Sequence, residues 1–299
     1  MDNAIKYHFN RGIKETVQLT GGWKGTWLLT LSDNQKLIFR AHPDGTTSGG
    51  RKIIMADIFR REKFFYENVN KKLGHICPEV YIIDDTCEYY ENSYQISEYI
   101  EGEKLSKCFR DGFDNKTKNE ISYKIGEIAA KINQIEIDPN HFYITSRNSW
   151  EEYLANRLYE RLIPLVKNGF ITVEEINKIC EDMRNKKAAH TLSFTHLDMR
   201  HTNMIYNNGN IFILDAENCE FGDPLHELAV IDVAQESNDY LIEGYKSISK
   251  DINLDSELYY FYKLERLGLV MDIHFNMINV PSQLYLDIFN EVKEKVLLN

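Results

Sequence analysis

The stretch "FTHLDMRHTNMIYNNGNIFILDAENCEFGDPLHELA" occupies residues 194–229, and its spacing decides the fold. Asp198 follows His196 by two residues, and Asn203 follows Asp198 by five. Asp215 comes twelve residues after Asn203, at the end of the apolar run 211–214. A metal-binding loop, a helix cap and a phosphotransfer loop would each use some of these residues, so the rest of the chain has to distinguish among them.

Length and composition describe a globular protein. The 299 residues are 43% apolar and 12% aromatic, which suits one large domain or two small ones with a real core. No long apolar run and no signal-peptide pattern is present, so we expect a soluble, cytoplasmic protein. The formal charge of −11 disfavours nucleic acid or an anionic membrane as partner and is compatible with a cationic substrate, although it also serves solubility. The five cysteines contain no C-x-x-C pair, which argues against a zinc or redox site.

The first hundred residues are rich in short β-prone runs. "ETVQLT" (15–20), "TWLLTL" (26–31) and "KLIFRA" (36–41) are separated by turns, which predicts a meander of antiparallel strands. Residues 51–73 carry apolar side chains at helical spacing and predict one amphipathic helix. "EVYIIDD" (79–85) and "SYQISEYI" (93–100) predict two further strands.

From Gly102 onward the pattern changes to helices. Helical periodicity covers residues 118–137, 149–166 and 172–186 and resumes after Pro224. Between these helices lies an island of short strand-like runs within residues 192–215. The chain contains no internal repeat and no obvious linker, so we expect two lobes, 1–101 and 102–299, that pack as one unit.

The joint spacing of Asp198, Asn203 and Asp215 is the layout of the kinase signature. Phosphoryl transfer needs a carboxylate that orients a hydroxyl and accepts its proton, and oxygen ligands for magnesium between phosphates that repel one another. Each residue alone has an ordinary structural explanation, because Asp and Asn commonly cap turns or bond their own backbone. A zinc site at His196, Asp198 and His201 is disfavoured because no further ligand pair accompanies them. The strands on both sides favour the phosphotransfer loop.

The chain resembles the aminoglycoside phosphotransferase and choline kinase family of small-molecule kinases, from about residue 16 to about residue 230. Beyond the loop, "DAE" at 215–217 is similar to the family's D-x-E or D-x-D, and "GDPLHELA" at 222–229 to its G-D-P-x-x-D-L-A. Upstream, similarity to the phosphate loop, third strand, glutamate-bearing helix and hinge is carried by "LTGGWKGTWLLTL", "KLIFRA", "RREKFFYENV" and "YQISEYIEGEKL". The resemblance implies an α+β, bilobal, protein-kinase-like fold. Its nucleotide-binding N-lobe, residues 1–101, would be an antiparallel sheet with one long helix. Its mainly helical C-lobe, residues 102–299, would hold the catalytic loop and the substrate site.

The resemblance assigns roles to individual residues. Asp198 would be the base that positions the acceptor hydroxyl, and Asn203 and Asp215 would bind Mg²⁺. Arg40 stands where kinases place the lysine of the third strand and would reach the nucleotide phosphates, with Glu62 as its ion-pair partner. An ordinary surface pair is the competing explanation for both residues.

The phosphate loop and the hinge complete the expected nucleotide site. Gly21, Gly22 and Gly25 would let backbone amides approach the phosphates, because glycine has no Cβ in the way. Lys24 would add positive charge at the tip of this loop. In the hinge, the backbone from Ser97 to Tyr99 would meet the purine edge.

Several residues depart from the family's pattern. Leu197 stands where the family commonly has glycine, and Glu227 replaces the usual aspartate. Arg200 either stabilises charge on the transferred group or forms a salt bridge across the loop. We expect Asp223 to hold the catalytic loop through backbone hydrogen bonds, and His196 to pack beneath it.

The expected function is a Mg²⁺-dependent kinase that uses ATP or GTP and phosphorylates a hydroxyl of a small, cationic molecule. An aminoglycoside-type antibiotic is the leading substrate, and acidic side chains at 151–160, 172–176, 251–257 and Asp272 would bind it. The alternative is a choline, ethanolamine or amino-sugar metabolite, with the aromatic residues 259–262 and Phe275 stacking on an ammonium group. A non-catalytic binding protein with a kinase-like fold is a second class, disfavoured because Asp198, Asn203 and Asp215 are all present. By analogy we expect a monomer.

Overall fold

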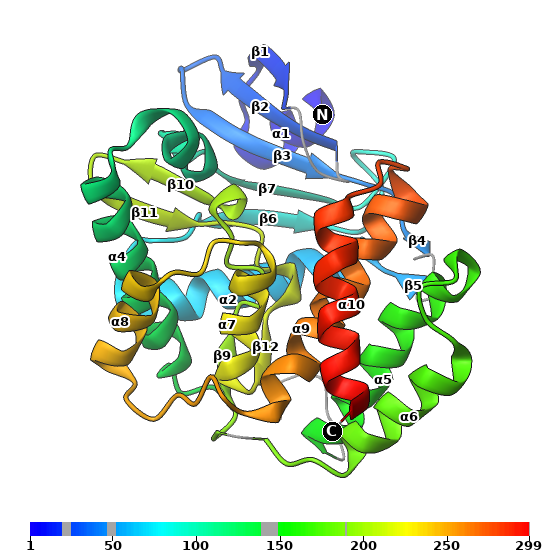
Figure 1. Ribbon diagram of the computed structural model, residues 1–299. Coiled ribbons are helices and arrows are strands. Elements are labelled where there is room, and N and C mark those ends of the chain that lie inside the picture. Colours follow the sequence, from blue (N-terminus) through cyan, green and yellow to red (C-terminus); the bar gives the residue numbers. More distant parts are fainter. Residues whose placement is uncertain (20–24, 47–51, 139–148, 189, 299) are drawn as a thin grey trace. The chain divides into compact units, whose positions relative to one another are not determined.

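The computed structural model describes residues 1–19, 25–46, 52–138, 149–188 and 190–298, which form two compact units (Figure 1). The first unit holds the described parts of Met1–Thr46 and Lys52–Gly112 together with His201–Cys219. The second holds the described parts of Phe113–Arg200 and Glu220–Asn299. Strands concentrate in the first and helices in the second, which confirms the predicted α+β class. The lobe boundary between residues 101 and 102 stays a prediction, and the compact units divide the chain elsewhere.

A five-stranded antiparallel sheet forms the centre of the first unit, in the order β1-β2-β3-β7-β6. Its strands are β1 (Ile13–Gln18), β2 (Gly25–Leu31), β3 (Lys36–Ala41), β6 (Val80–Asp84) and β7 (Tyr94–Glu98). The meander and the two later strands are therefore confirmed. The sheet follows directly from short β-prone runs that are separated by turns.

Alternation along β3 gives the sheet two different faces. Leu37, Phe39 and Ala41 are buried and pack with Ala4 and Ile5 of helix α1 (Asp2–Phe9). Because successive side chains of a strand point to opposite faces, Arg40 lies on the other face. That face meets helix α2 (Met55–Leu73), whose Phe59 ring lies 5.7 Å from the Arg40 guanidinium carbon.

The predicted helix at residues 51–73 begins later than expected. Residues 52–53 form a short strand, β5 (Lys52–Ile53), which pairs with β4 (Gly45–Thr46). The backbone N–H of Met55, the first residue of α2, donates to the side chain of Asp44 at 2.9 Å. Arg51 lies outside the described residues, and the prediction of helix at residues 52–54 was wrong, because a distant side chain and a strand partner fix the beginning of the helix.

The strand-like island is divided between the units. In the first unit, β10 (Met204–Asn207) and β11 (Asn210–Ile213) form a hairpin beside β8 (Glu103–Lys104). Short helical turns complete this unit: α3 (Leu105–Lys107), η1 (Cys108–Gly112), η3 (His201–Asn203) and η4 (Ala216–Asn218). In the second unit, β9 (Ser193–Thr195) pairs with β12 (Glu220–Gly222), a strand that the sequence did not predict.

The rest of the second unit is helical. Its elements are α4 (Asn115–Asn133), α5 (Trp150–Leu162), η2 (Ile163–Asn168), α6 (Val173–Arg184), α7 (Pro224–Val233), α8 (Asp239–Ile248), α9 (Glu257–Asp272), η5 (Ile273–Met277) and α10 (Gln283–Leu298). Proline explains the end of α5, because Pro164 cannot continue the α-helical ladder. Across the described residues, every helix is too short or too polar to span a bilayer.

Helices α4 and α8 approach each other through glycine. A Cβ atom on Gly126 of α4 would lie 2.0 Å from the carbonyl oxygen of Leu241, and one on Gly244 of α8 would lie 2.0 Å from that of Tyr123. Both obstacles are backbone atoms, which cannot rotate away as a side chain can. The two glycines therefore set the separation of this helix pair.

We expect Gly244→Ala to lower the free energy of unfolding by about 1–3 kcal/mol, since overpacking a tight contact costs more than the gain in helix propensity. Urea unfolding followed by circular dichroism would measure this loss. Gly12→Ala is the control, because a Cβ there would meet no atom within 4 Å. Equal stability of the two variants would contradict the close packing of α4 and α8.

Candidate active site

The predicted site residues fall into two groups. Arg40, Glu62, Asn203 and Asp215 belong to the first unit, and Asp198 with its neighbours belongs to the second. Each group is described within its own unit.

In the first unit, Arg40 is the centre of a buried ion-pair network. Its Nη1 donates to Glu62 Oε2 at 2.5 Å, and its Nη2 lies 3.3 Å from Asp215 Oδ1. The Glu62 side chain is fully buried and that of Arg40 is 14% exposed, so this is not the surface pair that the sequence left open. Burial alone would lower the pKa of Arg40, but the carboxylates of Glu62 and Asp215 raise it above its ordinary value. Arg40 is therefore a fixed positive charge.

Asp215 is held through its backbone as well as its side chain. Its N–H donates to the hydroxyl of Tyr66 on α2 at 2.7 Å. Its φ of 61° is left-handed, a conformation that Asp tolerates better than most residues. This backbone turn ends the apolar strand β11 and presents a carboxylate that is 38% exposed.

The register of the β10–β11 hairpin brings Asn203 and Asp215 to the same end of that hairpin. Met204 pairs with Ile213, and the N–H of Leu214 donates to the carbonyl of Asn203 at 2.8 Å. A carboxylate and an amide oxygen are the donors that Mg²⁺ prefers, and in nucleotide sites the remaining ligands come from phosphates and water. In the described part of the chain, no group of three or more His, Cys, Asp or Glu could hold a metal by itself. The donor set thus fits a magnesium ion that arrives with a nucleotide.

Gln95 of β7 is a polar neighbour of Arg40 that the sequence did not single out. It lies opposite Arg40 in the β3–β7 register, and its Oε1 is 3.4 Å from Arg40 Nη1. Gln95 Nε2 and Glu62 Oε1 are buried, and neither has a hydrogen-bond partner among the residues that the structure describes. Since buried polar atoms are normally paired, these two atoms offer one donor and one acceptor beside the guanidinium.

The phosphate loop and the hinge are described in part. Gly21, Gly22 and Lys24 lie outside the described residues. Gly25 begins β2, where a Cβ would come within 2.3 Å of the Trp27 ring, so a packing constraint already requires glycine there. Ser97 lies inside the sheet, paired with both Ile38 and Val80, whereas Tyr99 follows the last residue of β7. Backbone groups that could meet a purine edge are therefore expected from Tyr99 onward.

In the second unit, the Asp198 carboxylate lies between two arginines. Arg200 Nε donates to Asp198 Oδ1 at 2.6 Å and Arg200 Nη2 to Oδ2 at 3.1 Å, while Arg266 of α9 donates to Oδ1. Burial would raise the pKa of Asp198, but the positive charges of Arg266 and Arg200 lower it to about 2. Asp198 is therefore ionised at neutral pH, and of the two alternatives for Arg200 the salt bridge across the loop is present.

The backbone next to Asp198 is strained, and a buried carboxylate accepts hydrogen bonds from it. Leu197 has a left-handed φ of 56°, a conformation that glycine adopts freely and that costs a leucine about 1–2 kcal/mol. Burial of the Leu197 side chain, 1% exposed, offsets this cost. Glu227 Oε2 accepts hydrogen bonds from the N–H groups of His196 at 2.6 Å and Leu197 at 2.8 Å. Glu227 therefore accepts the backbone hydrogen bonds of the loop, a role that we expected Asp223 to have.

The remaining polar residues of the motif have structural partners. Asp223 caps α7 by accepting from the N–H of Leu225 at 2.9 Å, and it accepts from the Tyr262 hydroxyl at 2.9 Å. His196 is fully buried and its Nδ1 accepts from the N–H of Asp198, so it packs under the loop as expected. In the first unit, His201 stacks on Phe109, and burial lowers the pKa of His201 to about 4.

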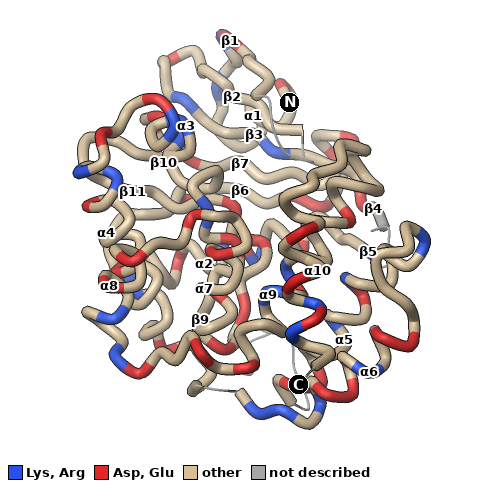
Figure 2. The backbone as a smooth tube through the Cα atoms, in the orientation of Figure 1, with Lys and Arg blue, Asp and Glu red and all other residues tan. Residues whose placement is uncertain are grey.

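Some of the acidic side chains expected to bind a cation already form ion pairs within the protein. Both acidic and basic residues occur on the helices of the second unit (Figure 2). Glu152 pairs with Arg184 at 2.8 Å, and Glu257 with Lys186 at 2.5 Å.

The aromatic residues expected to bind an ammonium group are likewise engaged. Lys295 lies over Tyr260 at 4.9 Å, Tyr259 donates to Asp232, and Phe275 packs edge-on against Phe170. In the described chain these rings contact other side chains of the protein instead of forming an open aromatic cage.

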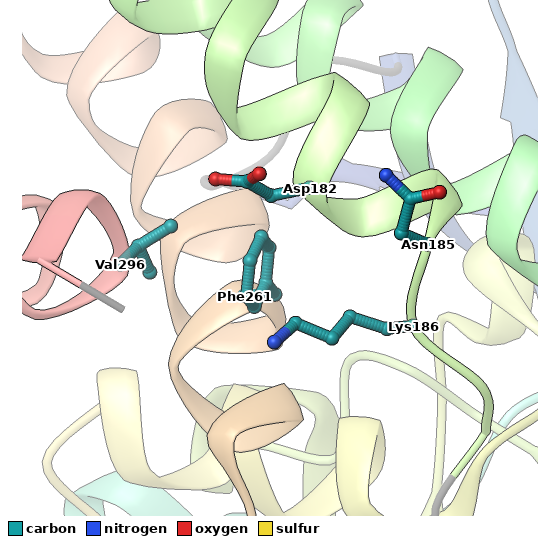
Figure 3. Close-up of a pocket in the computed structure, with 5 residues that line it drawn as sticks. All are labelled: Asp182, Asn185, Lys186, Phe261 and Val296. Carbon is teal, nitrogen blue, oxygen red and sulfur yellow. The ribbon is translucent and has the colours of Figure 1, made fainter.

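Two hollows of the second unit are lined by none of the residues expected to hold the nucleotide, Mg²⁺ or the acceptor hydroxyl, although Phe261 in the first is one of the aromatic residues named for an ammonium group. One, of about 110 Å³, is lined by residues of α6, α9 and α10, and Figure 3 shows the Phe261 ring beside the Lys186 side chain there. It is too small for a nucleotide or a drug-sized ligand. A wider, open groove along α4 and α8 is lined by positively charged lysines and negatively charged glutamates.

Comparison with known proteins finds a matching family model and solved structures that share the fold over the whole chain. The model of the phosphotransferase enzyme family matches residues 15–236. A candidate fructosamine-3-kinase from Haemophilus somnus 129PT aligns over 99% of this chain and 96% of its own, with 17% identity and a TM-score of 0.73. A thermostable mutant of the aminoglycoside phosphotransferase APH(4)-Ia, solved with ADP and hygromycin B, covers 100% and 98%, with 14% identity and a TM-score of 0.67. An aminoglycoside phosphotransferase of the APH(2") type, solved with GDP and kanamycin, covers 99% and 97%, with 11% identity and a TM-score of 0.64. No curated protein matches significantly. The predicted protein-kinase-like fold is confirmed.

Replacing Glu227 tests how the loop is held. We expect Glu227→Ala to lower the free energy of unfolding by about 2–6 kcal/mol, because two buried N–H groups lose their acceptor at about 1–3 kcal/mol each. Glu227→Gln keeps the length and one acceptor oxygen and should lose clearly less. Urea unfolding of both variants measures the difference, and equal losses would contradict a role for these two hydrogen bonds.

Proposed function

The chain belongs to the phosphotransferase enzyme family, and from this premise we propose that it is a Mg²⁺-dependent kinase that transfers the γ-phosphate of ATP or GTP to a hydroxyl of a small molecule. The observation that carries the proposal is the buried Arg40–Glu62 ion pair with Asp215 beside it. A strand cation paired with a helix glutamate is the arrangement by which kinases hold nucleotide phosphates. In relatives of the same fold, GDP or ADP is bound.

The first unit would bind the nucleotide. Arg40 would contact the phosphates, and Gln95 Nε2 is a further donor beside it. Asn203 and Asp215 would hold Mg²⁺, which when bound neutralises phosphate charge. Gly21, Gly22, Lys24 and Gly25 would cover the phosphates, and the backbone near Tyr99 would meet the purine.

The second unit would orient the acceptor. The acceptor oxygen forms a bond to the γ-phosphorus while the bond from that phosphorus to the bridging oxygen of the nucleoside diphosphate breaks. Asp198 would accept a hydrogen bond from the hydroxyl and take its proton as the new bond forms. With its low pKa, Asp198 acts mainly by fixing the direction of attack and is a weak base in the ground state.

The acceptor we propose is a polyhydroxylated amine, with aminoglycoside-type compounds first and amino-sugar metabolites second. Kanamycin and hygromycin B are bound in two similar structures, and another similar structure is a candidate fructosamine-3-kinase. A choline-type acceptor has less support, since the aromatic residues it would need already have partners. The protein would act as a soluble monomer.

Asp198→Asn tests this function. Wild-type protein should bind Mg·ADP or Mg·GDP and should consume ATP or GTP with at least one acceptor from a panel of aminoglycosides, amino sugars, fructosamine, ethanolamine and choline. The variant should lose about 10²–10⁴-fold in kcat while nucleotide affinity stays unchanged, because only the acceptor-orienting group is altered. Calorimetry and a coupled nucleotide assay supply the two measurements.

Asp287→Asn is the matched control, since among the described residues the one hydrogen bond to this carboxylate on α10 comes from the exposed side chain of Gln283. Absence of Mg²⁺-dependent nucleotide binding in the wild type would overturn the proposal. Binding without turnover on any acceptor would favour the non-catalytic alternative.

A further inference from the structure

Gln95 is a buried amide at a place in the sheet where an apolar side chain is expected. Strand β7 pairs with β3 on one side and β6 on the other, and Gln95 is only 1% exposed. Its neighbours Tyr94 and Ile96 are buried in the core on the opposite face. Buried positions of this kind usually hold apolar residues, because an amide that lacks hydrogen-bond partners is costly to remove from water. A glutamine here therefore needs a partner that uses its polar atoms.

That partner is Arg40, which stands directly opposite Gln95 on β3. Gln95 Oε1 lies 3.4 Å from Arg40 Nη1, and Oε2 of Glu62 on helix α2 lies 2.5 Å from the same nitrogen. Because each terminal nitrogen of a guanidinium carries two hydrogens, these two acceptors account for both hydrogens of Nη1. The amide must present its oxygen here, since its N–H groups would meet another donor. A strand and a helix therefore hold one nitrogen of Arg40 between them.

The other terminal nitrogen of Arg40 lies on the side that solvent reaches. Nη2 is 3.3 Å from Asp215 Oδ1, and the Asp215 side chain is 38% exposed, whereas that of Glu62 is fully buried. A phosphate that enters the first unit beside Asp215 would therefore meet the guanidinium at Nη2. Holding Nη1 from the buried side fixes this orientation.

We propose that Gln95 is a positioning residue for the nucleotide phosphates: with Glu62 it holds Arg40 Nη1, so that Nη2 faces the phosphates, and it makes position 40 specific for arginine. This inference rests on the proposed function and adds to it the residue that orients the phosphate-binding cation. As a neutral acceptor, Gln95 restrains the guanidinium without adding a negative charge that would repel phosphate.

The preference for arginine follows from the number and placement of its donors. A guanidinium spreads five N–H groups over three nitrogens, so it can bind internal acceptors through one nitrogen and a phosphate through another. A lysine ammonium carries all its donors on one nitrogen and cannot serve both sides in this way. With lysine at position 40, either the phosphates or the Gln95 oxygen would lose a donor, and a buried oxygen without a donor is destabilising.

A double-mutant cycle tests the pairing, with Arg40→Lys, Gln95→Met and the combination of both. Methionine is close to glutamine in volume and has no oxygen, so it removes the acceptor while it fills the space. Calorimetry should show that the affinity for Mg·ADP falls about 3–10-fold in Gln95→Met and about 10–100-fold in Arg40→Lys. In the Arg40→Lys background, Gln95→Met should cost less than about twofold, because the oxygen has no guanidinium left to hold. Mg·GDP takes the place of Mg·ADP if the wild type prefers it.

The nucleoside without phosphate separates the positioning of Arg40 from general damage to the fold. Adenosine, or guanosine, shares the base and the sugar of the diphosphate but offers Arg40 no phosphate to bind. Its affinity should be unchanged in Gln95→Met, so that the ratio of diphosphate to nucleoside affinity falls by about 3–10-fold. A merely structural role for Gln95 would leave this ratio unchanged.

Gln35→Met serves as the control. Gln35 also accepts from an arginine, Arg11 Nη1 at 2.5 Å, but this pair lies at the surface of the same unit. Both affinities of this variant should match those of the wild type.

A second variant covers a failure of Gln95→Met to fold, as judged by circular dichroism. Gln95→Glu keeps the shape and an acceptor oxygen, and at about pH 8 it adds a carboxylate that competes with the phosphates for Arg40. It should lower the affinity for the diphosphate and leave that for the nucleoside unchanged. Equal affinities for the diphosphate in Gln95→Glu and the wild type would overturn the inference.

Three results of the cycle overturn the inference alone. They are an unchanged affinity ratio in Gln95→Met, an Arg40→Lys variant that binds the diphosphate as tightly as the wild type, and a loss in the double variant equal to the product of the two single losses. A wild type that binds no Mg²⁺-nucleotide overturns the proposed function and the inference with it. Because the wild type is titrated first, the two failures are distinguished before any variant is measured.

Discussion

An ionised carboxylate that is almost fully buried is the constraint on which the second unit depends. Asp198 is 5% exposed, and without positive partners its charge would cost several kcal/mol to keep out of water. Arg200 and Arg266 supply that charge from two different elements, the loop and helix α9. The loop must therefore keep its position beside α9. Glu227 holds it there by accepting hydrogen bonds from the N–H groups of His196 and Leu197, where the loop backbone is strained.

The first unit also buries a charge, but one of the opposite sign. There the buried charge is the cation Arg40, and Glu62 and Asp215 surround it. The strand places the guanidinium on the face that meets α2, and the hairpin returns Asp215 to it from far along the chain. In both units an arginine–carboxylate network joins segments that are distant in sequence. Such networks contribute specificity of arrangement more than net stability, because desolvation offsets most of their attraction.

Much of the fold and part of the candidate site could be predicted from the sequence. Alternating β-prone runs predicted the five strands of the main sheet, and the spacing of Asp198, Asn203 and Asp215 predicted a kinase-like hairpin. The prediction was wrong where a contact distant in sequence intervenes. Helix α2 begins at Met55, because β5 pairs with β4 and Asp44 accepts from the Met55 N–H. Gln95 and Arg266 were missed because each looks ordinary within its own strand or helix, and only the partners, Arg40 and Asp198, reveal them.

The sequence by itself determined the five strands of the main sheet, the helical character of the second unit, the family, and which carboxylates and amide stand at kinase spacing. These properties are local, since they depend on periodicity, turn residues and separations along one segment. Tertiary structure alone decided which charges meet: that Arg200 turns onto Asp198, that Arg266 joins it from α9, and that Glu227, not Asp223, accepts from the N–H groups of His196 and Leu197. The physical reason is that ion pairing and desolvation depend on distances through space, which residue order along a chain does not specify.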